Sequence, residues 1–136
     1  MNIINLENKR VVITGASKGL GSVCAKALAD CGACLVLIAR SKEKLETLRK
    51  SLKDAEKHIC IVADLTDRKQ LYECIKTAEE FLGFIDVVLH VVGGGLGLRN
   101  PLLEADDFIK LFTLNVLVAA EIKRIIIPQM VKRGAG

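Results

Sequence analysis

Two kinds of apolar pattern alternate along the chain. Residues 10–14 and 34–39 are short runs that are apolar at almost every position, and residues 58–63 and 84–92 are similar. Such runs predict strands that are buried on both faces, as in a parallel sheet. Between them, apolar residues recur every three or four positions, which predicts helices with one buried side. The chain is therefore expected to alternate between strands and helices.

Capping residues mark the ends of the predicted helices. The first helix has an apolar side of five residues: Leu20, Val23, Ala27, Leu28 and Cys31. Ser41 can cap the start of the second helix, and Asp67 that of the third, which should stop at Gly83. The fourth helix is expected over roughly residues 106–132, with a bend at Pro128.

Strands and helices that alternate in this way form right-handed crossover units on one sheet. The doubly wound arrangement of such units orders the strands 3-2-1-4. The predicted fold is therefore an α/β, Rossmann-type doubly wound parallel sheet, without the later strands of larger sheets. With 136 residues, the chain is expected to form a single domain over residues 1–136.

Charge and composition narrow the classes of partner. The net charge of +4 is mild, and the densest basic stretch, residues 40–57, holds seven basic and four acidic residues without an interleaved aromatic. This stretch is typical of a solvated helix face rather than of a nucleic-acid interface. The N-terminus lacks the apolar segment of a secretory signal, and the longest apolar runs are too short to span a bilayer. We therefore expect a cytoplasmic protein that binds neither nucleic acid nor membrane.

The five cysteines are odd in number and unevenly spaced, which does not suggest a disulfide framework. Cys31 and Cys34 match a C-x-x-C pattern, but neither His58 nor His90 lies at a metal-ligand spacing from them. We interpret both cysteines as small apolar residues at a helix end and a strand start, and expect no metal site.

Three glycines follow the first predicted strand, at Gly15, Gly19 and Gly21. A glycine-rich turn between a buried strand and a helix lets the backbone approach a diphosphate, and the helix start offers unpaired N–H groups. The spacing G-x-x-x-G-x-G differs from the commoner G-x-G-x-x-G fingerprint. It predicts phosphate binding, with a plain tight turn as the alternative.

The end of the second predicted strand distinguishes between two dinucleotides. An acid at this place binds the ribose 2′-hydroxyl of NAD, whereas an arginine suits the 2′-phosphate of NADP. Here the residue is Arg40, and Lys18 in the glycine turn is a second cation within reach. Both favour NADP, unless Arg40 is an ordinary surface cation.

Four segments together resemble the short-chain dehydrogenase/reductase family in its NADP-preferring form: "TGASKGLG", "ARSKEKLE", "ADLTD" and the asparagine of "LFTLNVLVAAE". The resemblance covers essentially the whole chain and implies hydride transfer between a nicotinamide cofactor and a small-molecule carbonyl or alcohol. It implies that Arg40 binds the 2′-phosphate and that Asp64 and Leu65 border the adenine. It assigns six residues of the glycine turn to the cofactor phosphates: Gly15, Ser17, Lys18, Gly19, Leu20 and Gly21.

One motif departs from the family pattern. Where the family has N-N-A-G after the fourth strand, this chain has His90-Val91-Val92-Gly93. The resemblance implies that Gly93 passes close to the cofactor ribose, but the asparagines that tie this loop to its neighbours are missing. The loop must be held differently, and the segment "GGGLG" suggests mobility. His90 is interpreted as a hydrogen-bonding packing residue, with a catalytic role as the alternative.

The resemblance also defines what catalysis would need. The family uses a tyrosine as acid or base, and a lysine four residues later lowers the pKa of the phenol. Tyr72 and Lys76 have this spacing, but they precede the fourth strand, whereas the family's pair follows a fifth. We interpret them as neighbours on a helix surface. Asn115 matches the family's catalytic relay asparagine, and a satisfied core amide is the alternative.

These observations favour the cofactor-binding first half of an NADP-dependent oxidoreductase, which alone would be inactive because the family's catalytic serine, tyrosine and lysine are missing. The alternative is a non-catalytic NADP-binding or interaction module. We also expect self-association and, from the resemblance, a homo-oligomer. Residues 84–92 would form an apolar edge strand, and the fourth helix would expose a patch that includes Leu111, Val118 and Ile122.

Overall fold

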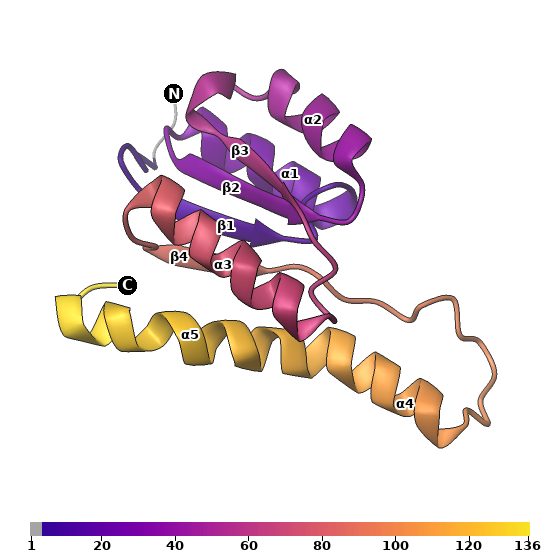
Figure 1. The fold of residues 1–136 in the computed structure, drawn as a ribbon. Helices are drawn as coiled ribbons and strands as arrows, with labels where there is room; N and C mark the ends of the chain where they lie inside the picture. Colours follow the sequence, from indigo (N-terminus) through magenta and orange to yellow (C-terminus); the bar gives the residue numbers. More distant parts are fainter. Residues whose placement is uncertain (1–3) are drawn as a thin grey trace.

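The computed structural model describes residues 4–136, so residues 1–3 of the predicted domain lie outside the described part. A four-stranded sheet forms the middle layer, and helices cover both of its faces (Figure 1). In chain order the elements are β1 (Arg10–Thr14), α1 (Gly19–Asp30), β2 (Cys34–Ala39), α2 (Lys42–Ser51), η1 (Ala55–Lys57), β3 (Ile59–Val62), α3 (Arg68–Leu82), β4 (Val87–His90), α4 (Ala105–Phe112), η2 (Thr113–Leu117) and α5 (Val118–Arg133). The segment η1 is a 3₁₀ turn, and η2 is π-helical.

The sheet is parallel throughout, and its strands are ordered β3-β2-β1-β4. Val12 of β1 lies opposite Val36 of β2 on one side and Val88 of β4 on the other. This order confirms the predicted α/β doubly wound arrangement of a Rossmann-type fold. The central strands are apolar at nearly every position because helices cover both faces and leave no solvent side for polar residues.

Two apolar cores lie on opposite faces of the sheet. On one face, Leu35 and Leu37 of β2 pack with α1 and with Leu45 of α2. On the other face, β1 and β2 pack against α3 and α5, where Ile75 and Ile122 are fully buried. In Figure 1, α3 and α5 lie side by side across this second face. Within residues 4–136, no helix combines the length and apolar character needed to cross a bilayer.

The buried side of α1 differs from the predicted one. Leu20 and Val23 are 67% and 64% exposed, and the buried residues are Gly21, Ala25 and Ala29. The apolar side predicted from Leu20 and Val23 is therefore wrong. Small side chains let α1 approach the sheet closely, and that close approach leaves no room beneath it for large residues. Periodicity alone does not reveal this distance.

The predicted helix caps are confirmed. The Ser41 hydroxyl accepts a hydrogen bond from the Lys44 N–H at the start of α2. The Asp67 carboxylate accepts from two N–H groups in the first turn of α3. Gly83 ends α3 with a φ of +80°, a conformation that glycine adopts readily. The side chains of Ser41 and Asp67 thus satisfy N–H groups at the helix starts that have no partner within the helix.

The long C-terminal helix forms over nearly the predicted range but is not uniform. The helical segments α4, η2 and α5 follow one another without a break, and the irregular turn lies at Thr113–Leu117. Pro128 lies inside α5, and the bend expected there stays a prediction. In Figure 1, α4 projects beyond the sheet, and the segment after β4 makes a wide excursion to reach it.

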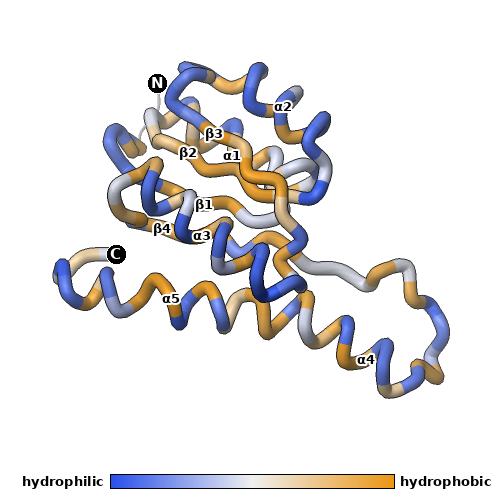
Figure 2. Tube along the Cα trace, viewed as in Figure 1, coloured by the Kyte–Doolittle hydropathy of each residue, from blue (hydrophilic) through white to orange (hydrophobic). Residues whose placement is uncertain are grey.

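The exposed patch on this helix is not the predicted one. Val118 and Ile122 are 2% and 0% exposed because α5 packs on the sheet and against α3. Besides Ile127 and Val131 of α5, a group of exposed apolar residues lies just before Val118, on α4 and η2, where the helix has left the sheet (Figure 2). This group consists of Phe108, Ile109, Phe112, Val116 and Leu117, whereas Leu111 of the predicted patch is only partly exposed. The strand β4 is an edge of the sheet as predicted, although it is shorter than residues 84–92.

Candidate functional site

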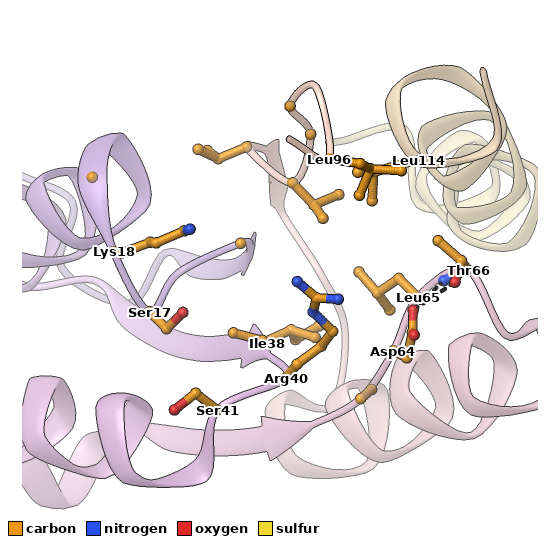
Figure 3. A pocket seen from close by; sticks show the side chains of 18 of the residues that line it. Ser17, Lys18, Ile38, Arg40, Ser41, Asp64, Leu65, Thr66, Leu96 and Leu114 are labelled. Atoms are coloured by element: carbon orange, nitrogen blue, oxygen red, sulfur yellow. Dashed lines mark hydrogen bonds between the residues drawn. The ribbon is translucent and has the colours of Figure 1, made fainter. Parts of the chain in front are cut away.

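A cleft of about 1230 Å³ opens at the carboxyl ends of all four strands (Figure 3). The loops that follow β1, β2, β3 and β4 form its floor and sides, and α4 with η2 supplies a further wall. Ligands of open α/β sheets bind at this edge. Nine of the predicted site residues line the cleft: Gly15, Ser17, Lys18, Gly19, Leu20, Arg40, Asp64, Leu65 and Gly93.

The glycines of the turn after β1 serve different purposes. Gly15 has a φ of +69°, and a β-carbon there would lie 2.8 Å from the backbone nitrogen of Val92. Gly19 has a φ of +54° and faces open space. Gly21 does not line the cleft, but a β-carbon there would collide with the carbonyl oxygen of Gly15. Two glycines therefore permit close backbone packing, and one permits the turn.

The start of α1 faces the cleft without a side-chain cap. Its N-cap residue, Lys18, makes no capping hydrogen bond, and its first turn carries no acidic residue. The first N–H groups of a helix have no partner within it, so they attract an anion. Together with the cradle that the glycines leave open, these donors fit the diphosphate of a dinucleotide.

Two cations point into the cleft from different elements. Figure 3 shows Lys18 on the glycine turn and Arg40 after β2, with both side chains directed into the open space. Neither makes an ion pair or side-chain hydrogen bond with any residue in the described range 4–136. Because neither cation has a partner among these residues, the two together favour a ligand that carries a negative charge in addition to its diphosphate.

Asp64 is held by its own loop after β3. Its Oδ1 atom accepts hydrogen bonds from the Thr66 N–H at 3.0 Å and from the Thr66 hydroxyl at 2.6 Å. The Asp64 N–H donates to the side chain of Gln70. Leu65 is 5% exposed and belongs to the core, so only its edge reaches the cleft. These contacts fix the position of the loop beside the cleft.

Thr14 holds the loop after β4 where the family pattern has asparagines. Its hydroxyl oxygen accepts from the N–H groups of Val91 and Val92, at 3.2 and 3.3 Å, and the hydroxyl donates to the carbonyl of Leu89. Thr14 is fully buried at the end of β1. The sequence analysis did not identify it, although a hydroxyl at the end of a buried strand needs a partner and was a usable signal.

Asn115 fastens the same loop from the opposite side. Its Oδ1 atom accepts from the Gly94 N–H at 2.9 Å, and its Nδ2 atom donates to the Gly94 carbonyl at 3.0 Å and to the Leu111 carbonyl at 2.8 Å. A β-carbon at Gly93 would lie 2.8 Å from Oδ1, so a side chain there would crowd this contact. Asn115 does not line the cleft, and its side chain is wholly committed to the backbone.

His90 lies at the end of β4, opposite Thr14 in the register of the sheet. It does not line the cleft. Partial burial of the ring and the nearby positive charge of Lys123 hold the pKa of His90 below its ordinary value. The neutral imidazole is therefore favoured. The His90 side chain is exposed and makes no hydrogen bond within residues 4–136, so its interpretation as a hydrogen-bonding packing residue stays a prediction.

The Tyr72 and Lys76 pair lies on α3, away from the cleft. The Tyr72 hydroxyl donates to a carboxylate oxygen of Glu121 on α5, at 3.3 Å. Lys76 is exposed and lies 3.9 Å from Glu80 on its own helix. Both side chains are thus surface neighbours, as their place before the fourth strand indicated.

The wall formed by α4 and η2 was not anticipated from the sequence. It is made by Ile109, Lys110, Thr113 and Leu114, and Leu96 faces the cleft from the loop after β4 (Figure 3). These residues are far in sequence from the glycine turn, and no local pattern marks them. Ser41, the N-cap of α2, and Lys44 within α2 were also not predicted as lining residues.

Comparison with known proteins connects this site to a family. A model of the short chain dehydrogenase family matches residues 9–136. The chain is 33% identical over 132 residues to the ketoacyl reductase HetN of Nostoc sp., an alignment that covers 96% of this chain and 46% of that protein.

Two solved structures share the fold. One is a metagenomic short-chain oxidoreductase in complex with NADP, with 25% identity, a TM-score of 0.86, and coverage of 96% of this chain and 60% of that one. The other is 3-ketoacyl-(acyl-carrier-protein) reductase from Brucella melitensis complexed with NADH, with 26% identity, a TM-score of 0.84, and coverage of 96% and 55%. The chain spans about half the length of the relatives it matches. Because the family match extends over nearly all of its residues, the chain belongs to the short-chain dehydrogenase family of oxidoreductases, and both of these solved relatives hold a nicotinamide cofactor.

Proposed function

We propose that this chain provides the cofactor-binding part of an NADP-dependent oxidoreductase that transfers hydride between the nicotinamide and a small-molecule carbonyl or alcohol. The bound cofactor would supply or accept the hydride. The residues of this chain would bind and orient it. The two ketoacyl reductases among the relatives support a carbonyl substrate.

The observation that carries the choice of NADP is the charge at the end of β2. Arg40 follows the strand where NAD-preferring sites place an acid, and it shares the cleft with Lys18. The solved relatives include one complex with NADP and one with NADH, so the fold accommodates both cofactors. Local residues must therefore decide between them, and an arginine suits the 2′-phosphate.

The other proposed contacts come from the family resemblance, and the lining of the cleft supports them. The glycine turn and the start of α1 would hold the diphosphate, with Ser17 and Leu20 beside it. Asp64 and Leu65 would border the adenine, and Gly93 would face the ribose near the nicotinamide. The place of Asn115 in a proton relay stays a prediction, and its bonds to Gly94 support a role in positioning this loop.

The assembly and compartment of the protein are part of the proposal. The exposed apolar residues of α4, among them Phe108 and Phe112, support a homo-oligomer. The five cysteines are all free thiols, which supports a reducing compartment such as the cytoplasm.

The test compares the affinities of the chain for 2′-phospho-ADP and ADP. We expect the unmodified chain to prefer 2′-phospho-ADP, and Arg40→Ala to remove about 1.5–3 kcal/mol of that preference, as for a charge-assisted hydrogen bond. Lys42→Ala is the matched control, since Lys42 is exposed on the same loop–helix junction but does not line the cleft. Equal affinity of the unmodified chain for both nucleotides would refute the NADP assignment.

A further inference from the structure

A third cation lies at the end of the cleft proposed for the 2′-phosphate. Lys44 of α2 lines the cleft together with Arg40 and Ser41, and although it lies in the segment "ARSKEKLE", the sequence analysis gave it no role. We propose that Lys44 is a second specificity-determining residue for the 2′-phosphate of NADP and acts beside Arg40. The inference rests on the proposed function, because it concerns the same cofactor site.

The place of Lys44 on α2 brings its side chain back toward the strand end. Ser41 is the N-cap of α2, and its hydroxyl accepts from the Lys44 N–H at 3.4 Å. Lys44 therefore lies in the first helical turn. Side chains on a helix lean toward its N-terminus, so the ammonium group is carried toward Arg40 and the end of β2. The neighbouring Leu45 is fully buried on the sheet, which fixes the rotation of α2 about its axis.

The charges of the cleft are unbalanced in favour of an anion. Among the described residues, four cations and a single acid line it. One of these cations, Lys110, is paired with Asp107 at 3.2 Å. Lys18, Arg40 and Lys44 make no ion pair anywhere in the range 4–136. Cations that line the same cleft repel one another, so an anion bound among them is stabilised by their combined charge.

Charge alone does not explain why Lys44, rather than the nearby Lys42, should bind the 2′-phosphate. Lys42 lies two residues earlier on the same helix, which places it about 200° away around the axis. It is exposed and does not line the cleft. The two lysines thus have the same charge, and Lys42 is even nearer to Arg40 along the chain, but only Lys44 borders the site. Lys42 is therefore a matched control.

The experiment measures the dissociation constants of 2′-phospho-ADP and ADP for the chain and three variants by calorimetry. Lys44→Met removes the charge and keeps the length of the side chain. We expect it to lower the preference for 2′-phospho-ADP about three- to ten-fold, without changing the affinity for ADP. Lys44→Arg should retain the preference, and so should Lys42→Met. The effect of Lys44→Met should shrink as salt is added, because exposed charges are screened.

The possible outcomes separate the inference from the function on which it rests. If the unmodified chain shows no preference between the nucleotides, the NADP assignment fails and the inference fails with it. If the chain has the preference and Lys44→Met keeps it in full, only the inference is overturned. Equal losses in Lys44→Met and Lys42→Met, or a matching loss of ADP affinity in Lys44→Met, would overturn it as well.

Discussion

Replacing Asn115 tests whether this side chain holds the loop that borders the cleft. Asn115→Ala removes three hydrogen bonds at once, two to Gly94 and one to the Leu111 carbonyl. Alanine is the best helix former, so the substitution does not weaken the long helix through its backbone preference. The change therefore acts on the loop rather than on the helix that carries the side chain.

The expected change in the free energy of loop opening follows from these hydrogen bonds. A hydrogen bond contributes about 0.5–1.5 kcal/mol net, and the lower part of the range applies because the Gly94 contacts are exposed and water can replace them. Loss of the two bonds to Gly94 should lower the free energy of local loop opening by about 1–1.5 kcal/mol. Since about 1.4 kcal/mol corresponds to a factor of ten, the Gly94 amide should exchange roughly ten times faster.

Hydrogen exchange of the Gly94 amide is the direct assay, and thermal unfolding measures the rest of the molecule. We expect faster exchange with little change in the unfolding temperature, because Asn115 lies outside both apolar cores. Asn100→Ala is the control: Asn100 accepts a single hydrogen bond, from the Leu102 N–H, and does not contact Gly94. Unchanged exchange at Gly94 in Asn115→Ala would refute the view that this side chain holds the loop.

Two other predictions concern activity and assembly. The chain alone should not turn over NADPH with a panel of carbonyl compounds, because Tyr72 lies on α3 outside the cleft and donates its hydroxyl to Glu121 of α5; turnover that Tyr72→Phe abolishes would contradict this. The chain should self-associate through α4, where Phe108 and Phe112 are 57% and 55% exposed, and Phe108→Asp should weaken the association. Light scattering at micromolar concentration measures the association, and a monodisperse monomer of the unmodified chain would contradict the prediction.

The sheet was predictable because its determinants are local and repeated. Buried runs such as residues 34–39 alternate with periodic helices, and the crossover rule then restricts the strand order. Gly15 contacts the distant loop after β4, but the turn itself was predictable for a related reason, since its glycines lie between a buried strand and a helix and Gly21 packs against Gly15 within this unit. In both cases the signal lies in a short stretch of sequence.

The buried side of α1 and the far wall of the cleft were not predictable in this way. Leu20 and Val23 have the spacing of a buried side, but they are exposed because α1 lies too close to the sheet for large side chains. Leu114 reaches the cleft only because η2 returns to the sheet edge after the excursion past β4. Such placements depend on distances between elements, which the spacing of apolar residues does not encode.

The loop after β4 shows how the departure from the family motif is accommodated. Without asparagines in the loop itself, two residues outside it provide the bonds: Thr14 on β1 holds Val91 and Val92, and Asn115 on η2 holds Gly94. Thr14 is the last residue of the central strand β1, and Asn115 belongs to the helical segment that forms the far wall of the cleft. A shift of that helix relative to the sheet would therefore pull on the loop that faces the cofactor ribose in our proposal. In this chain, the position of the loop is therefore controlled by its two neighbours.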